Sequence, residues 1–327
     1  MGALTDPFGR RIEYLRISVV DRCNLGCFYC QPGGQCKHRR AAKPLTRSQL
    51  LQVAGTAAEL GIRKIRLTGG EPLVRKDIVE IVRGLAGLPG IEDLSLTTNG
   101  THLAALAQPL KEAGLRRVNI SLDSLDADNF ARITAGGDLQ ATLDGISAAL
   151  QAGLQPLKIN MVVMKGINDR EIPAFAELTR TEEIHVRFIE YMPMRGQDET
   201  WRKYYLPSGE IMRRLAAGGE LVPAPEEDMN GPAVNYRYRG ATGILGLITP
   251  VSRHFCAACN RLRLTNDGKL RPCLFADKEV DLLPALLAGK DLRPLFAAAV
   301  IQKPSHDVSP AARGASCGPR GMAEIGG

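Results

Sequence analysis

A short apolar strand, a turn and an amphipathic helix recur along the chain from Tyr14 to Glu190, and this repeat constrains the fold more than any other feature. Repeated strand and helix units predict a parallel sheet covered by helices, either doubly wound or rolled into a barrel. Eight strands close the common barrel of this kind, so fewer strands predict an open or partial (β/α)6 barrel. Six segments read as strands: YLRISVV from Tyr14, KIRLT from Lys64, DLSLTT from Asp93, RVNISLD from Arg117, LKINMVV from Leu157 and IHVRFIE from Ile184.

Polar residues lie at or just after the ends of several of these strands. They include Thr68 to Pro72, Thr97 to Gly100 and Ser121 to Ser124, and a cysteine-rich loop follows the first strand. In parallel α/β folds the active site forms at the carboxyl ends of the strands, so we expect these residues to meet at one mouth. Between the first two strands, Thr46 and Gln49 have the spacing of a capping box and predict the start of a helix.

The strand and helix rhythm changes at about residue 190. Pro and Gly become more frequent, and two shorter strand candidates follow, VNYRYRG from Val234 and ILGLI from Ile244. We predict a barrel at residues 1–190, a smaller C-terminal module at 191–302 and a tail at 303–327. The tail is rich in Pro, Gly, Ser and Ala, and we expect most of it to be poorly ordered until something binds it.

Composition favours a globular protein of the cytoplasm. Of 327 residues, 44% are hydrophobic and 24% are charged, and no apolar run reaches the roughly 18 residues that would span a bilayer. The N-terminal segment MGALTDPFGRRIEYLRIS has no signal-peptide hydrophobic region. Eight cysteines in a cytoplasmic chain indicate metal or redox chemistry rather than a disulfide framework.

The net charge of +7 indicates an anionic partner. Aromatic residues make up only 5% of the chain, and no basic stretch interleaved with aromatics suggests a surface on which bases stack. These features argue against nucleic acid, and a phosphorylated small molecule fits the net charge as well. The chain lacks a GxxxxGK[ST] loop, so a nucleoside triphosphate would be held by side chains. Candidates within the predicted strands are Arg16, Arg66 and Lys158, since cations in strands are costly unless they meet an anion.

Cys23, Cys27 and Cys30 form a CxxxCxxC group, CNLGCFYC, in the loop after the first strand. Three thiolates this close can hold three irons of a cubane cluster and leave the fourth iron to a substrate or cofactor. A structural zinc is the alternative, because Cys36 lies six residues further on and would complete an all-thiolate site.

A second group consists of Cys256, Cys259 and Cys273, again three cysteines rather than four. His254 stands two residues before this group and would complete a zinc site of three thiolates and one imidazole, so zinc remains open here as well. Within the same stretch, CNRLRLT, the side chains of Arg261 and Arg263 point to one face if the segment is a strand. They would then reach one anionic ligand beside a metal, or else be two solvated charges.

Gly69 and Gly70 begin a GGEP segment directly after the second strand. Paired glycines let a backbone approach a ligand closely, and the strand-end amides and carbonyls can pair with that ligand. The motif is weak by itself, because Gly-Gly and Pro also occur in ordinary turns.

Together, the CxxxCxxC group with Tyr29 before its last cysteine and the GGEP strand end resemble the radical S-adenosylmethionine superfamily. The second cysteine group, the NRLRLT run and the terminal Gly-Gly narrow the resemblance to the GTP 3′,8-cyclase family of molybdenum cofactor biosynthesis. The resemblance covers about residues 8–275 and the last few residues.

The resemblance implies two [4Fe-4S] clusters, one on each cysteine group, with S-adenosylmethionine on the first and the guanine of GTP on the second. It implies that Tyr29, Gly70, Ser121 and Met192 line the S-adenosylmethionine site. The implied contacts to GTP are Arg16, Arg66, Thr97, Lys158, Arg261 and Arg263. Arg261, Arg263, Gly326 and Gly327 are the implied catalytic residues, since in the family the terminal Gly-Gly reaches into the active site.

The implied reaction is that of a lyase. An electron from the first cluster cleaves S-adenosylmethionine into methionine and a 5′-deoxyadenosyl radical, which takes hydrogen from C3′ of GTP. The C3′ radical then attacks guanine C8, and reduction of the cyclised radical gives the product. The implied partners are a reductant such as ferredoxin or flavodoxin, cyclic pyranopterin monophosphate synthase downstream, and a second copy in a homodimer.

Two stretches depart from the family pattern. They are the basic segment Gly33 to Lys43, which adds Cys36, and the tail, which adds Cys317. We interpret both extra cysteines as bystanders, because each group of three already suffices. Two other functions remain open, a peptide-modifying radical S-adenosylmethionine maturase and a structural module with two zinc ions.

Overall fold

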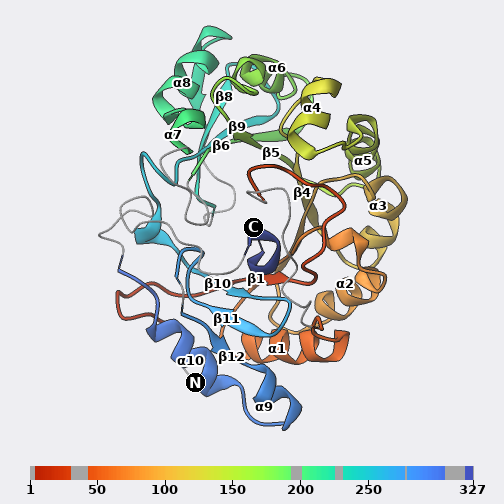
Figure 1. Cartoon of the computed structure of the whole chain (residues 1–327), viewed down its shortest axis with the longest axis vertical. Helices are drawn as coiled ribbons and strands as arrows, with labels where there is room; N and C mark the ends of the chain where they lie inside the picture. The colour runs from red at the N-terminus through yellow and green to blue at the C-terminus, as the bar shows by residue number, and fades with distance from the viewer. Residues whose placement is uncertain are drawn as a thin grey trace.

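The computed structural model describes residues 4–30, 43–192, 201–224, 231–276, 278–305 and 321–326. Within these residues, one 12-stranded sheet has the order β12-β11-β10-β1-β2-β3-β4-β5-β6-β9-β8-β7. The sheet curves around a central space, and the C-terminus of the chain lies in the middle of that curve (Figure 1). The inner face of this curved sheet is therefore surrounded by strands on most sides (Figure 1).

Six parallel strands form the middle of the sheet, in the order of the sequence. They are β1 (Tyr14–Ser18), β2 (Lys64–Thr68), β3 (Asp93–Thr98), β4 (Arg117–Ser121), β5 (Leu157–Val163) and β6 (Ile184–Glu190). Each coincides with a strand expected from the sequence, and two of them, β1 and β4, end two residues earlier than expected. The prediction of an α/β fold with a parallel, partial barrel is confirmed.

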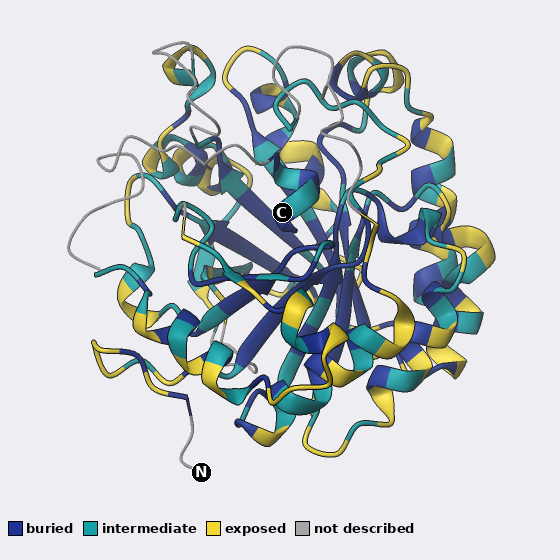
Figure 2. Cartoon of the chain, turned by 60° about the horizontal axis from the view of Figure 1, so that its bottom comes forward, coloured by how far each residue is buried: buried dark blue, intermediate teal, exposed yellow. Residues whose placement is uncertain are grey.

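Side chains alternate between the two faces of these strands, as a pleated sheet requires. On β1, Leu15 and Ile17 are fully buried beneath helices, while Tyr14 and Arg16 point to the enclosed face. The strands accordingly form the buried interior of the molecule, and the surrounding helices expose one side to solvent (Figure 2). The outer face is thus the hydrophobic core, and the inner face is left for polar groups.

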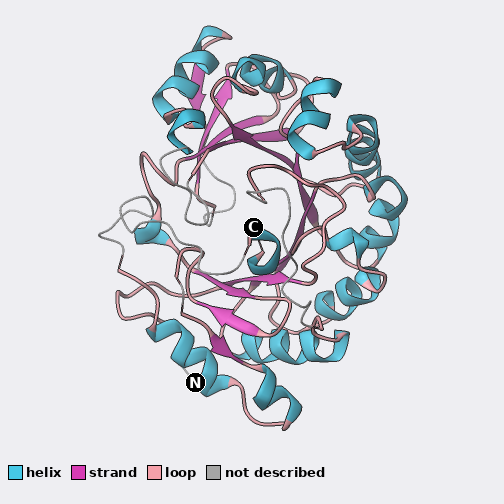
Figure 3. Cartoon of the chain, in the orientation of Figure 1, coloured by secondary structure: helices cyan, strands magenta, loops and turns pink. Residues whose placement is uncertain are grey.

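Helices cover the outer face of the curved sheet, as Figure 3 shows. The first helix is capped at Thr46, whose side chain and that of Gln49 form the reciprocal capping box expected from the sequence. Between β1 and β6 these elements are α1 (Arg47–Glu59), η1 (Pro72–Val74), α2 (Ile78–Ala86), α3 (Leu103–Glu112), α4 (Ala127–Thr134), α5 (Leu139–Gln151), η2 (Asp169–Glu171) and α6 (Ile172–Glu177).

Residues after β6 extend the sheet at both edges. At one edge β9 (Ile244–Ile248) pairs in parallel with β6, and β8 (Ala233–Tyr238) and β7 (Leu221–Pro223) follow antiparallel. At the other edge β10 (Arg261–Leu264) pairs in parallel with β1, followed by β11 (Lys269–Arg271) and β12 (Val280–Asp281). Both strand candidates after residue 230 are confirmed, as β8 and β9. The division of the chain at residue 190 stays a prediction, because the sheet itself continues across it.

Six short helices belong to the C-terminal half. They are α7 (Trp201–Tyr204), α8 (Ser208–Ala217), η3 (Cys256–Ala258), α9 (Leu283–Leu287), α10 (Arg293–Ile301) and α11 (Met322–Ile325), counted over the residues that the structure describes. The last one, α11, contacts β1 on the enclosed side of the sheet. Among the helices described, none is both long and apolar enough to cross a membrane.

Candidate active site

The inner face of the sheet lines a cavity of about 380 Å³. Inward-pointing residues of neighbouring strands stand side by side in register: Arg263 of β10, Arg16 of β1 and Arg66 of β2 form one such row. Thr97 of β3, Asn119 of β4 and Lys158 of β5 form another. The sequence-predicted GTP contacts are therefore brought together, and all six line this cavity.

Both cysteine groups also line the cavity. Cys23, Cys27 and Cys30 follow the carboxyl end of β1, whereas Cys259 lies two residues before Arg261, the first residue of β10. Because β1 and β10 are parallel neighbours, the two groups stand at opposite ends of this pair of strands. Cys273 follows β11, which runs antiparallel to β10 and so returns toward Cys259.

None of these six cysteines is in a disulfide. Over the part of the chain that the structure describes, no three His, Cys, Asp or Glu side chains are grouped closely enough to hold one metal ion. A [4Fe-4S] cluster makes a different demand, because each thiolate binds its own iron. Three soft thiolates at each end of the cavity therefore fit two such clusters. Cys36 and Cys317 lie outside the described residues.

The thiols of the two groups lie in different electrostatic surroundings. Burial raises the pKa of Cys27 above its ordinary value, and the nearby Asp123 adds to this effect. The pKa of Cys259 is lowered: burial acts to raise it, but the charges of Lys303 and Arg261 outweigh that cost. The second group is thus surrounded by cations, as suits thiolate ligands.

The two glycines of the GGEP segment accommodate the start of the first cysteine loop. A Cβ atom on Gly70 would lie 2.2 Å from the carbonyl oxygen of Arg22, and one on Gly69 would lie 2.3 Å from that of Val20. The amides of Gly70 and Glu71 instead donate hydrogen bonds of 2.8 Å to these two carbonyls, Val20 and Arg22 respectively. The backbone that approaches the glycines most closely is therefore the chain's own, and this contact fixes where the cysteine loop begins.

Glu71 connects the ends of two strands. Its buried carboxylate accepts hydrogen bonds from the hydroxyl of Thr98 at 2.7 Å and from the amides of Asn99 and Leu73 at 2.7 and 2.9 Å. Burial raises the pKa of Glu71 to about 7, against these hydrogen bonds. Glu71 is thus a structural residue of the cavity rim, a role that sequence reasoning did not assign to it.

Tyr29 is anchored by a carboxylate. Its hydroxyl donates a hydrogen bond of 2.5 Å to the carboxylate of Asp123, which follows β4. The same carboxylate accepts a hydrogen bond of 2.8 Å from the amide of Val162. Burial raises the pKa of Asp123 to about 6 and raises that of Tyr29 as well. The four residues that the sequence predicts for S-adenosylmethionine, Tyr29, Gly70, Ser121 and Met192, all line the cavity.

The cavity wall is crowded with positive charge. Burial, together with the charges of neighbouring arginines, lowers the pKa of Arg16 to about 9 and that of Arg263 to about 10. Tyr14 offsets part of this crowding, because its ring faces the guanidinium groups of Arg66 and Arg261 at 5.6 and 5.8 Å. A polyanion bound in the cavity would relieve this repulsion.

Sequence reasoning missed several residues of the same wall, among them Lys64, Asn119, Asn160 and Arg187. Asn119 is fully buried, and neither atom of its amide has a hydrogen-bond partner among the described residues. The hydroxyl of Thr97, which pairs in register with Asn119, is also buried without a hydrogen-bond partner among the described residues. The alternation of side chains along a strand could have identified Asn119, because Asn119 and Ser121 are two residues apart and so face the same side. The sequence had already placed Ser121 in the site.

An open parallel barrel whose first strand leads into a CxxxCxxC loop defines the radical S-adenosylmethionine class of proteins. The family model described as Radical SAM superfamily matches residues 17–179, and that described as Molybdenum Cofactor Synthesis C matches residues 184–308. The fold resembles that of Streptococcus suis SuiB bound to S-adenosylmethionine, with a TM-score of 0.60 and 16% identity over 88% of this chain and 67% of that chain.

Similar curated proteins identify the family within this class. Three proteins named GTP 3′,8-cyclase are 49% identical (Moorella thermoacetica, covering 99% of this chain and 100% of the relative), 48% identical (Listeria monocytogenes serovar 1/2a, 94% and 92%) and 50% identical (Geobacter sulfurreducens, 86% and 86%). The chain belongs to the GTP 3′,8-cyclase family.

Proposed function

We propose that the protein is a radical S-adenosylmethionine lyase that converts GTP to (8S)-3′,8-cyclo-7,8-dihydroguanosine 5′-triphosphate, the first step of molybdenum cofactor biosynthesis. One observation carries the proposal: two groups of three cysteines lie at opposite ends of the β1 and β10 pair, with arginines between them in one cavity. The five residues of β1 span roughly 16 Å, a length that suits an extended nucleoside triphosphate.

Cys23, Cys27 and Cys30 would hold the first [4Fe-4S] cluster and Cys256, Cys259 and Cys273 the second, each with one iron left for a ligand. When bound, the first cluster and S-adenosylmethionine supply the 5′-deoxyadenosyl radical that takes hydrogen from the ribose of GTP. The protein's own part is to place the two substrates together and to keep water from the cavity. The hydrogen bond between Tyr29 and Asp123 supports that placement, because it holds the first cysteine loop against the end of β4.

The triphosphate would be bound by the cations of the cavity wall. Arg16, Arg66, Lys158, Arg261 and Arg263 are the candidates, and guanidinium groups suit phosphate because they donate paired hydrogen bonds. The unpartnered amide of Asn119 and hydroxyl of Thr97 supply neutral donors and acceptors in the same wall. Arg263 and Gly326 are in direct contact, which supports a catalytic role for the C-terminal residues; Gly327 lies outside the described residues.

We further propose the setting in which the enzyme acts. It would work in the cytoplasm as a homodimer, take electrons from ferredoxin or flavodoxin, and pass its product to cyclic pyranopterin monophosphate synthase. The division into a barrel at 1–190, a module at 191–302 and a tail at 303–327 belongs to the same proposal.

Anaerobic reconstitution with iron and sulfide tests the proposal. The reconstituted protein is incubated with dithionite, S-adenosylmethionine and GTP, and both 5′-deoxyadenosine and the cyclised nucleotide are measured. About eight irons per chain and a GTP-dependent product are expected for two cubanes. The same iron with 5′-deoxyadenosine but no nucleotide product would contradict GTP as substrate. Bound zinc without iron uptake would contradict the whole proposal.

A further inference from the structure

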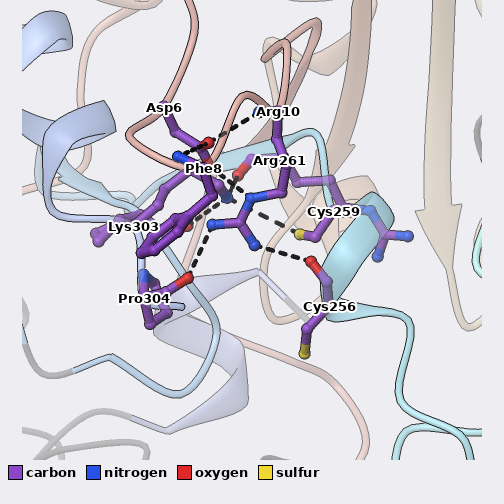
Figure 4. A network of polar contacts seen from close by, with 9 residues as sticks. Asp6, Phe8, Arg10, Cys256, Cys259, Arg261, Lys303 and Pro304 are labelled. Atoms are coloured by element: carbon purple, nitrogen blue, oxygen red, sulfur yellow. Dashed lines mark hydrogen bonds and ion pairs between the residues drawn. The ribbon is translucent and has the colours of Figure 1, made fainter. Parts of the chain in front are cut away.

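A buried lysine, Lys303, contacts the second cysteine group. The residue is 4% exposed, and its ammonium donates hydrogen bonds to the carbonyl oxygens of Arg261 at 2.8 Å and Pro272 at 3.0 Å. The same nitrogen lies 3.9 Å from the sulfur of Cys259 (Figure 4). Pro272 directly precedes Cys273 and Arg261 follows Cys259 by two residues, so one ammonium connects the two stretches that carry these cysteines.

Arg10 supports the same region from the N-terminal segment. Its guanidinium donates hydrogen bonds of 2.8 Å to the carbonyl oxygens of Cys256 and Pro304, and it pairs with Asp6 at 2.5 Å (Figure 4). Asp6 is in turn fixed by the amides of Phe8 and Arg10, each at 2.9 Å. Residues 6–10 and 303–304, from opposite ends of the chain, are therefore linked to each other and to the second cysteine group.

Among the described residues, the ammonium of Lys303 donates its hydrogen bonds to neutral carbonyl groups. In the described part of the chain, no Asp or Glu forms an ion pair with Lys303, and the carboxylate of Asp6 is paired with Arg10. Burying an ammonium is costly unless an anion lies close by. The sulfur of Cys259, as a thiolate ligand, is the anion that the geometry provides.

We propose that Lys303 is a positioning residue of the second cluster, which it holds in two ways. It fixes the distance between the Cys259 and Cys273 stretches through two carbonyl hydrogen bonds, and its positive charge raises the reduction potential of the cluster bound there. The net charge around an iron–sulfur cluster and the hydrogen bonds to its sulfurs set its potential, and a nearby cation favours the more negative, reduced state. The inference rests on the proposed second cluster.

The test uses the full chain with Cys23, Cys27 and Cys30 replaced by Ala, so that only the second group binds iron. This parent is compared with Lys303→Met, Lys303→Gln and Lys303→Arg, and with Lys290→Met, the same change at an exposed lysine. After anaerobic reconstitution, iron per chain, the rate of iron loss to a chelator and the midpoint potential from an EPR-monitored titration are measured. Thermal unfolding checks that each variant is folded.

We expect Lys303→Met and Lys303→Gln to shift the midpoint potential to more negative values and to lose iron faster. Lys303→Arg keeps the charge and should retain most of the potential, and Lys290→Met should match the parent. An unchanged potential in either neutral variant that folds would overturn the inference. A parent that takes up no iron would overturn the proposed second cluster, and the inference with it, so the two failures are distinguishable.

Discussion

Arg263 donates a hydrogen bond from its Nη1 to the carbonyl oxygen of Gly326, 63 residues later in the chain. This contact places the C-terminal segment against the cation row of β10 and β1. Two further contacts hold it there: the hydroxyl of Ser18 donates to the carbonyl of Ala323 at 3.1 Å, and Ile325 is fully buried in a cluster with Met192. The end of the chain thus closes part of the cavity in which the reaction is proposed to occur.

Gly326→Ala should undock this segment. Gly326 has a φ of +73°, which costs an L residue about 1–2 kcal/mol, and a Cβ there would lie 2.6 Å from Thr68 Cγ2. We expect GTP cyclisation to fall roughly 5- to 30-fold with unchanged iron content. Gly321→Ala is the matched control, because Gly321 has a φ of −82° that any residue adopts. Equal activity of the two variants would contradict a docked role for Gly326.

Arg16→Met should weaken GTP binding without lowering stability. A charged hydrogen bond is worth about 1.5–3 kcal/mol, so the dissociation constant of GTP should rise roughly 10- to 150-fold in anaerobic calorimetry. Without GTP, removing one of several crowded cations lowers their mutual repulsion, so the thermal midpoint should not fall. Arg11→Met, at an exposed arginine, is the control for both measurements. A lower midpoint with unaltered GTP affinity would make Arg16 a structural residue.

Asn119→Leu separates binding from stability in the same way. The two amide atoms of Asn119 are buried without partners in the described structure, which costs about 1–3 kcal/mol, and Leu has a similar shape. We expect urea unfolding of the GTP-free protein to require more free energy in the variant, while GTP binding weakens. If the variant is less stable and binds GTP normally, the amide is not a substrate contact.

The sequence predicts those parts of the site whose residues lie close together in the chain, and it misses contacts between residues that lie far apart in the chain. Short apolar segments that recur with turns and helices predict the strand positions, and each cysteine or arginine motif lies within a short stretch of sequence, so the sequence predicts both. The pairing of β10 with β1 joins residues about 247 positions apart, as in Tyr14 and Arg261, and no local pattern encodes it. The burial of Lys303 was missed for the same reason: its partners, at Cys259, Arg261 and Pro272, lie 31–44 residues earlier.

The sequence predicts that the glycines of the GGEP segment let a ligand approach closely, and the structure shows a second role for them. Sequence reasoning held that Gly69 and Gly70 allow close approach of a ligand, and both do line the cavity. The structure adds that their missing side chains also make room for the carbonyls of Val20 and Arg22. A packing contact between two loops cannot be told from a ligand contact by residue type alone, because both need the same absence of a Cβ atom.

Glu71→Gln should remove part of the pH dependence of stability. The pKa of Glu71 in the folded protein is about 7, raised from 4.5 by burial, so the folded state retains a proton that the unfolded state has released. Stability from this group is complete below about pH 4.5 and is lost as the pH rises to 7, by up to about 3 kcal/mol. Urea unfolding of cluster-free protein between pH 5 and 8 should show this decline in the parent and in the exposed control Glu80→Gln, and a flatter profile in Glu71→Gln. Parallel profiles for all three proteins would show that the Glu71 carboxyl does not titrate in this range.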